Sequence, residues 1–184
     1  NRLVTDGQDF EVKQGTNFEQ LIAMLDVARN GVATVAMLKQ YIHKIAGMGY
    51  TELWLYLEDL FEVPEEPYFG RGRGRYSQQE LHEVALNGER FGVTVVPAIQ
   101  TLAHMHNALK WDAHHAVRDT ADTLLVGASE TRTFIEHIVR AATEPFITNR
   151  IHIGMDEAYQ LGRGAYLDKN GFTDQETLIL AQLK

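Results

Sequence analysis

The stretch SQQELHEVALNGERFGVTVVPAIQ, residues 77–100, joins a helical pattern directly to a strand pattern. Ser77 and Glu80 form a capping box, which predicts a helix start, and Gly92 predicts the end of that helix. The following residues 93–100 are rich in β-branched side chains, which favour strands. A helix that leads at once into an apolar strand is the repeating unit of an α/β fold.

The same alternation recurs on both sides of this stretch. Further apolar runs predict strands over residues 21–29, 52–59 and 150–157. Apolar residues three and four positions apart predict helices around Val35, Leu38, Ile42 and Ile45 and over residues 130–147, where Phe134, Ile138 and Ala142 share a face. A capping box at Thr173 and Glu176 predicts a last helix that runs to the C-terminus. The strands are apolar on both faces, as buried parallel strands joined by crossover helices should be.

Four strand–helix units are counted in this chain. A closed (β/α)₈ TIM barrel needs eight units and about 250 residues, whereas the chain has 184. We therefore predict an α/β fold of the TIM-barrel type with only about four units present, a partial barrel. Residues 1–21 would be a lead-in segment, and residues 22–184 the N-terminal half of such a barrel. The alternative is a small open α/β sheet that is complete in itself.

Composition limits the classes of function. The 17 Lys and Arg against 25 Asp and Glu give a formal net charge of −8, which argues against a nucleic-acid-binding surface. No apolar run approaches the length of a membrane helix, so no membrane partner is expected. The chain has no cysteine, which excludes disulfides and zinc–thiolate sites and is compatible with a cytoplasmic location.

Polar residues of catalytic type stand at the end of each predicted strand. They are Asp26 and Arg29, then Glu58 and Asp59, then Gln100, Thr101 and His104, and finally His152, Asp156 and Glu157. Functional groups of parallel α/β folds lie at the carboxyl ends of the strands, so these side chains are expected to converge. Any one of them alone could be a solvated strand end or a helix cap, and the prediction rests on their convergence.

Carboxylates that share a partly desolvated site push each other's pKa apart, so one can donate a proton while another stays ionised. Cleavage of a glycosidic bond requires this division of roles. An arginine at the same site suits the recognition of sugar hydroxyls, because its guanidinium offers several donors.

With these motifs in order, the chain resembles family-20 glycoside hydrolases, the β-N-acetylhexosaminidases. The motifs are LDVAR on the first strand, the ED pair after the second, QTLAH after the third and HIGMDE on the fourth. The most specific of them is H-x-G-x-D-E at residues 152–157. The resemblance implies retaining, substrate-assisted hydrolysis of terminal β-linked N-acetylglucosamine or N-acetylgalactosamine, without cofactor or metal. The implied partner is an N-acetylhexosamine-containing oligosaccharide or glycoconjugate.

The resemblance also implies roles for individual residues. Glu157 would be the general acid and then the base that activates water, and Asp156 would orient the acetamido group of the substrate. Arg29 would grip sugar hydroxyls, and His152 would have a structural role near the site. His104 would tune the acid together with a carboxylate of the second strand, for which both Glu58 and Asp59 are candidates.

Two motifs depart from the common family pattern. QTLAH at residues 100–104 stands where common members have DTPGH, and GMDE at 154–157 where they have GGDE. These changes indicate a divergent branch. The aromatic pocket walls that the family takes from later strands are absent, so the chain alone is expected to be inactive and to expose edges that favour self-association. Two other readings remain: a catalytically silent sugar-binding half-barrel, or a different, metal-assisted barrel hydrolase.

The sequence GRGRGR, residues 70–75, contains glycine and arginine but lacks the Lys-Ser/Thr of a phosphate-binding P-loop. It is predicted to be a flexible loop that rims the site. The histidine pairs at 104 and 106 and at 114–115 lack the spacing of a zinc site, which favours a metal-free interpretation.

Overall fold

The computed structural model describes residues 17–29 and 31–184, so most of the predicted lead-in segment lies outside the described residues. The strands are β1 (Ile22–Asp26), β2 (Glu52–Tyr56) and β3 (Thr94–Ala98). The helices are α1 (Val35–Gly47), α2 (Gln78–Arg90), α3 (His106–Leu109), the 3₁₀ helix η1 (Asp112–Val117), α4 (Ser129–Thr143), α5 (Ala165–Asn170) and α6 (Gln175–Gln182).

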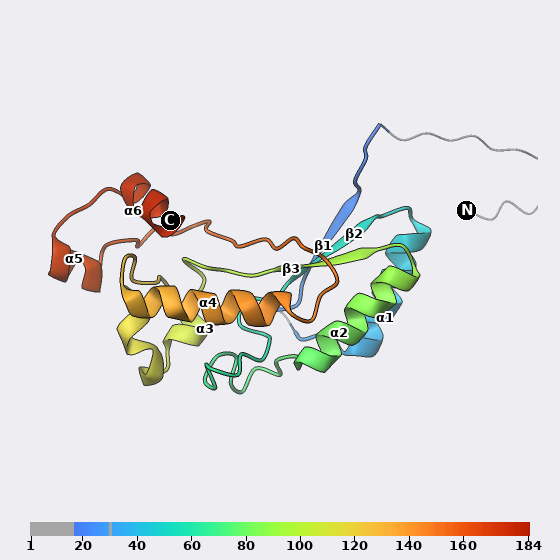
Figure 1. Ribbon diagram of the computed structural model, residues 1–184, viewed down its shortest axis with the longest axis horizontal. Helices are drawn as coiled ribbons and strands as arrows, with labels where there is room; N and C mark the ends of the chain where they lie inside the picture. Colours follow the sequence, from blue (N-terminus) through green and yellow to red (C-terminus); the bar gives the residue numbers. More distant parts are fainter. Residues whose placement is uncertain (1–16, 30) are drawn as a thin grey trace, which may run out of the picture.

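The three strands form a parallel sheet in the order β1-β2-β3, with Met24 opposite Trp54 and Trp54 opposite Val96. This confirms the predicted α/β class with parallel strands. Figure 1 shows α1 and α2 side by side along one side of the sheet, with α4 beyond them. The strands all point the same way because each connection crosses back through a helix, so their carboxyl ends meet at one edge.

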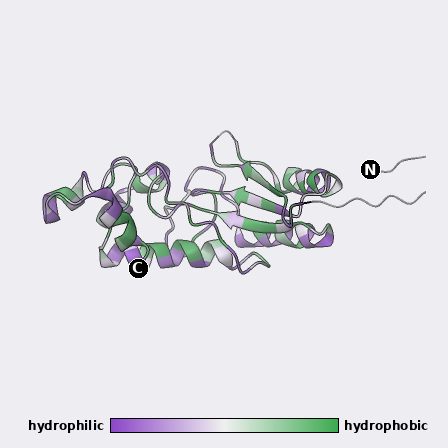
Figure 2. Ribbon diagram, turned by 90° about the horizontal axis from the view of Figure 1, so that it is seen from above, coloured by the Kyte–Doolittle hydropathy of each residue, from purple (hydrophilic) through white to green (hydrophobic). Residues whose placement is uncertain are grey.

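The core lies between this helical layer and one face of the sheet. Leu53 and Leu55 of β2 are fully buried there against the predicted apolar face of α1, of which Leu38, Ile42 and Ile45 are buried. Each such side chain contributes roughly 1.5–3 kcal/mol by leaving water. In Figure 2 the strands are mostly hydrophobic, whereas the helices carry both hydrophobic and hydrophilic residues.

The strands were predicted to be buried on both faces, and for β1 this is wrong. Met24 is 51% exposed and Ile22 is 38% exposed. β1 is the first strand of the described sheet, so its outer edge and part of its second face lack cover. The Trp54 side chain, one strand further in, is only partly exposed.

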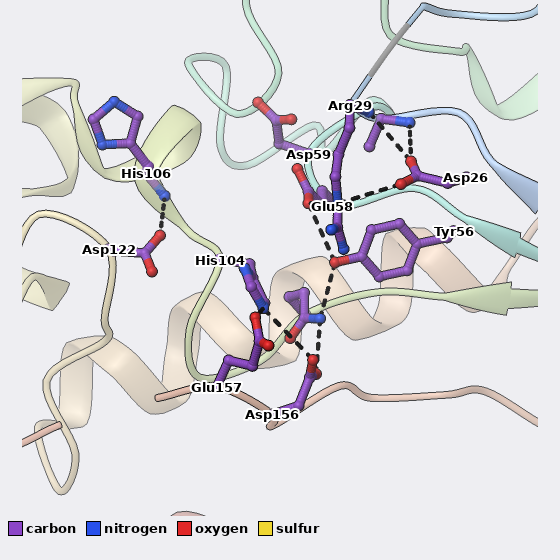
Figure 3. A network of polar contacts seen from close by, with 12 residues as sticks. Asp26, Arg29, Tyr56, Glu58, Asp59, His104, His106, Asp122, Asp156 and Glu157 are labelled. Carbon is purple, nitrogen blue, oxygen red and sulfur yellow. Dashed lines mark hydrogen bonds and ion pairs between the residues drawn. The ribbon is translucent and has the colours of Figure 1, made fainter. Parts of the chain in front are cut away.

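A fourth strand over residues 150–157 is also not formed as predicted. The segment runs beside β3, with a single parallel bridge between Ala98 and His152. Backbone hydrogen bonds join His152 N–H to the Pro97 carbonyl at 3.0 Å and Ile99 N–H to the His152 carbonyl at 2.8 Å. It follows the sheet without pairing over a full strand, and it still delivers Asp156 and Glu157 to the shared edge (Figure 3).

Helix ends confirm one predicted capping box and correct the other. Ser77 and Glu80 form both reciprocal bonds of the box at the start of α2. At α6, however, the N-cap is Asp174, whose carboxylate accepts from Thr177 N–H at 2.8 Å, one position beyond the predicted Thr173. In the described residues no helix is both long and apolar enough to span a bilayer.

Candidate active site

The predicted residues gather where the strands end, and some of them line a hollow of about 850 Å³, whereas Glu58, Asp59, Thr101, His104 and Glu157 are not part of its lining. Its walls are Met24, Asp26, Arg29, Tyr56, Gln100, residues 151–155 and Asp156. Figure 3 shows Arg29, Tyr56, Glu58, Asp156, Glu157 and His104 facing one another from the ends of different strands and the loops that follow them. The expected convergence is therefore present in the fold.

Asp26 at the end of β1 holds the start of the loop that carries Arg29. One of its carboxylate oxygens, Oδ1, accepts from the backbone N–H of Ala28 at 2.9 Å and of Arg29 at 3.2 Å. The other, Oδ2, lies 3.2 Å from Arg29 Nε, and Glu58 Oε1 lies 3.5 Å from the same nitrogen. Asp26 thus positions both the backbone and the guanidinium of Arg29.

A chain of hydrogen bonds runs from Glu58 to Asp156. The Tyr56 hydroxyl donates to Glu58 Oε1 at 3.2 Å, and Gln100 Nε2 donates to the Tyr56 oxygen at 3.0 Å. Gln100 Nε2 also donates to Asp156 Oδ1 at 3.1 Å. Gln100 is buried, and its amide links Tyr56 at the end of β2 to Asp156 of the HIGMDE motif.

His104 faces both acids of the HIGMDE motif. Its Nε2 lies 3.5 Å from Asp156 Oδ2 and 3.5 Å from Glu157 Oε2. Among the described residues, no ion pair joins His104 to Glu58 or Asp59. The role of His104 stays a prediction.

Local backbone geometry singles out the same residues. Of the described residues other than glycine, those with positive φ are Glu58 at 45°, His104 at 56° and Glu157 at 52°. Side chains with a Cβ rarely adopt this region, and such strain collects at functional sites. Three predicted site residues therefore hold costly conformations that the surrounding fold maintains.

The structure explains why the H-x-G-x-D-E motif has a glycine at position 154. A Cβ at this residue would lie 2.5 Å from the Ile99 carbonyl oxygen and 2.7 Å from the Gln100 side-chain amide, and its φ is 44°. Only glycine lets the motif backbone pass this close to the buried amide. The close passage is what brings Asp156 within reach of Gln100.

The surroundings shift the pKa values of the carboxyl groups in opposite directions. The hydrogen bond from Gln100 lowers the pKa of Asp156, assisted by the nearby His104, so Asp156 is ionised. Burial raises the pKa of Glu58, although the Tyr56 hydroxyl and Arg29 oppose that rise. Burial likewise raises the pKa of the Tyr56 hydroxyl. Asp156 is thus suited to accept a hydrogen bond from a ligand.

Asp59 lies apart from these groups. Its side chain is almost fully buried, and its Oδ1 lies 3.0 Å from Nε of Arg73. Burial raises the pKa of Asp59, and the Arg73 charge opposes this rise. Residues 70–75 were predicted to be a flexible rim loop, but Arg73 of this loop returns to the strand ends.

The histidines are placed in different surroundings. The ring of His152 lies 5.4 Å from that of Trp54, among the residues that line the hollow. His114 is buried, with Nδ1 2.7 Å from the Ala108 carbonyl and Nε2 3.3 Å from Glu66. In the described chain, ligand atoms of His104, Asp156 and Glu157 lie within 4.8 Å of one another, so they could approach a cation. The metal-free interpretation stays a prediction.

Sequence reasoning did not assign Tyr56 and Arg73, and it placed Gln100 among the polar strand-end residues without giving it a role. Tyr56 ends a strand and Arg73 lies in a glycine-rich loop, so neither carries a local signal for a site. Asp26, which taken alone could have been an ordinary solvated strand end, is a partner of Arg29.

Comparison with known proteins places this geometry in context. The profile described as "Glycosyl hydrolase family 20, catalytic domain" matches residues 22–177. Human hexosaminidase D is 27% identical over 153 residues, which are 81% of this chain and 31% of the human protein. The chain therefore spans about a third of the length of this relative.

Solved structures share the fold. A chitobiase of Flavobacterium johnsoniae superposes with a TM-score of 0.77 at 19% identity, over 91% of this chain and 29% of that one. The β-N-acetylhexosaminidase of Bacteroides fragilis superposes with a TM-score of 0.69 at 25% identity, over 77% of this chain and 32% of that one.

Proposed function

This chain belongs to glycosyl hydrolase family 20, and from that premise we propose that its full-length protein removes terminal β-linked N-acetylhexosamine from glycans. The reaction is retaining and substrate-assisted: the acetamido oxygen of the substrate attacks the anomeric carbon, and water later opens the resulting oxazolinium-type intermediate. The substrate is an oligosaccharide or glycoconjugate with a terminal N-acetylglucosamine or N-acetylgalactosamine.

The observation that carries the proposal is the different setting of two adjacent acids. Asp156 lines the hollow and accepts from Gln100, which keeps it ionised and able to accept the acetamido N–H. Glu157 is about as exposed as Asp156, 55% against 57%, but it does not line the hollow; it has a positive φ, and its Oε2 lies 3.5 Å from His104 Nε2. In this position it serves as the acid for the leaving oxygen and then as the base for water.

Arg29 completes the proposed site. It lines the same hollow, and the carboxylates of Asp26 and Glu58 both lie near its Nε. Its remaining N–H donors are suited to two neighbouring sugar hydroxyls. The hydrogen-bonded chain runs from Glu58, which contacts Arg29, to Asp156. Substrate therefore binds to Arg29 near one end of this chain and to Asp156 at the other.

Replacing Glu157 with Gln in the full-length protein tests the proposal. The variant should lose about 10²–10⁴-fold in kcat on an unactivated β-GlcNAc substrate, the contribution of a positioned acid–base group, while substrate binding by calorimetry is retained. Glu136→Gln, an exposed change on α4, should leave both unchanged. A full-length protein that binds N-acetylhexosamine without cleaving it would support the silent sugar-binding alternative instead.

We further propose that residues 1–184 alone have no useful activity, because β1, whose Met24 lines the hollow, is exposed and has no outer strand partner among the described residues. Assaying this chain and the full-length protein side by side on a chromogenic β-GlcNAc substrate tests this. Equal turnover would contradict it. Activity that is lost on treatment with a chelator and restored by a metal would favour the metal-assisted alternative.

A further inference from the structure

The GRGRGR loop, residues 70–75, makes a contact that links two strand ends. Arg73 Nη2 donates to the backbone carbonyl of Ala28 at 2.7 Å, across 45 residues of sequence. The same guanidinium meets Asp59 through Nε at 3.0 Å, and Nη2 lies 4.0 Å from Glu58 Oε2. One side chain therefore contacts the residues after β1 and both acids after β2.

The GRGRGR loop packs closely against the backbone of Asp59. Gly70 has a φ of 65°, and a Cβ there would lie 2.0 Å from the Asp59 carbonyl oxygen. Arg75 Nη1 donates to the Pro67 carbonyl at 3.3 Å, which holds the base of the loop. Both carboxylate oxygens of Asp59 are buried, so the Arg73 charge beside them compensates an ion that water does not reach.

The Ala28 carbonyl immediately precedes Arg29 in the chain. Arg29 Nε and Arg73 Nη2 also lie on opposite oxygens of the same Glu58 carboxylate, Oε1 and Oε2. Movement of Arg73 would thus remove one restraint on the backbone before Arg29 and one on its partner Glu58, leaving Asp26 as the other support of Arg29. Arg71, from the same loop, stacks over Tyr68 instead, 5.0 Å from the ring centre.

We propose that Arg73 is a positioning residue that fixes Arg29 and Glu58 relative to each other and so sets the affinity of the site for its sugar. This inference rests on the proposed function, in which Arg29 binds sugar hydroxyls. Arg73 itself is directed toward the protein, so its effect passes through Arg29.

The test must separate this role from simple stabilisation. Arg73→Met alone leaves Asp59 buried without a counter-charge and could prevent folding. The informative pair is therefore Asp59→Asn against the double variant Asp59→Asn/Arg73→Met, both made in the full-length protein. The first keeps the Arg73 bond to the Ala28 carbonyl, and the second removes it without leaving a buried charge. Arg71→Met is the matched control.

Loss of Arg73 from the Asp59→Asn background should raise KM for a β-GlcNAc substrate roughly tenfold, while kcat changes by less than about threefold. Arg73→Lys, made with Asp59 intact, should keep the charge beside Asp59 and allow folding. Its KM should still be raised, because one ammonium cannot reach Asp59 and the Ala28 carbonyl together. Arg71→Met should leave both constants unchanged. A double variant that loses kcat while its KM stays unchanged would overturn the proposal, and so would one in which neither constant changes.

A structural readout keeps this proposal distinct from the proposed function. In crystal structures, the Arg29 guanidinium should move by at least about 1 Å in the double variant relative to Asp59→Asn, a misplacement large enough to matter for binding. If the full-length protein cleaves no N-acetylhexosaminide, the proposed function fails. The displacement of Arg29 would still test whether Arg73 positions it. An Arg29 that stays in place would overturn the positioning role whatever the activity.

Discussion

At the scale of single residues, the site is held together by groups that are not themselves the expected catalysts. Gln100 is the clearest case, because its buried amide donates to both Tyr56 and Asp156. A carboxylate at this position, as in common family members, would repel Asp156 instead. The amide therefore lets the two sides of the site approach without sharing a proton.

Gln100→Glu should move the acid limb of the activity profile to higher pH. The Gln100 N–H lowers the pKa of Asp156. In the proposed reaction Asp156 acts as the ionised group, so activity should fall as pH drops through that pKa. The variant removes the donor and adds a like charge, and both effects raise the pKa of Asp156. The measurement is kcat/KM against pH for the full-length protein.

The control for this change is Gln79→Glu, an exposed position on α2 with the same change in charge. Its acid limb should coincide with that of the wild type. Coincident limbs for Gln100→Glu as well would contradict the assigned link between Gln100 and Asp156.

At the scale of elements, the sequence located α1, α2, α4 and α6 but not the short helices α3, η1 and α5, and it placed helix ends less accurately. The face of α4 with Phe134, Ile138 and Ala142 is buried as the spacing predicted. The start of α6 was placed one residue early, because Thr173 and Glu176 match a capping pattern but Asp174 makes the bond. Which of two neighbouring polar residues caps a helix depends on the approach of the preceding loop.

Asp174→Ala should lower the melting temperature of the protein more than Thr173→Ala, because only the former removes the acceptor for Thr177 N–H. The backbone N–H of Thr177 lowers the pKa of Asp174, so its contribution is present above the unfolded pKa and is lost as pH falls through the folded pKa. Thermal unfolding at neutral and acid pH measures both effects.

The difference between these two variants should therefore shrink in acid. A larger loss for Thr173→Ala would restore the capping box that the sequence suggested. A difference that does not depend on pH would show that Asp174 acts through something other than its charge.

At the scale of the whole molecule, the sheet has an unprotected side. β1 exposes Ile22 and Met24, and its outer edge has no strand partner in the described part of the chain. Apolar, unpaired edges promote association between chains. We therefore expect residues 1–184, when isolated, to self-associate through β1.

Met24→Lys should reduce this association, because a charge on the edge strand opposes pairing with a second copy. Met48→Lys makes the same chemical change at the end of α1, where Met48 is 69% exposed, and should have little effect. Sedimentation velocity over a range of concentrations measures the difference. Equal association of the two variants, or a monomeric parent chain, would contradict an interface at β1.

By itself, the sequence determined the alternation of helices and strands, the apolar helix faces and the candidate acids of the HIGMDE motif. These features are local, since periodicity and motif spacing arise within a few turns of chain. Only the tertiary structure decided which groups meet: Gln100 with Asp156, Arg29 with Glu58, and Arg73 with the Ala28 carbonyl. Those pairs join segments far apart in sequence, and their geometry depends on strand register, strained loop backbone and burial, none of which a local pattern encodes.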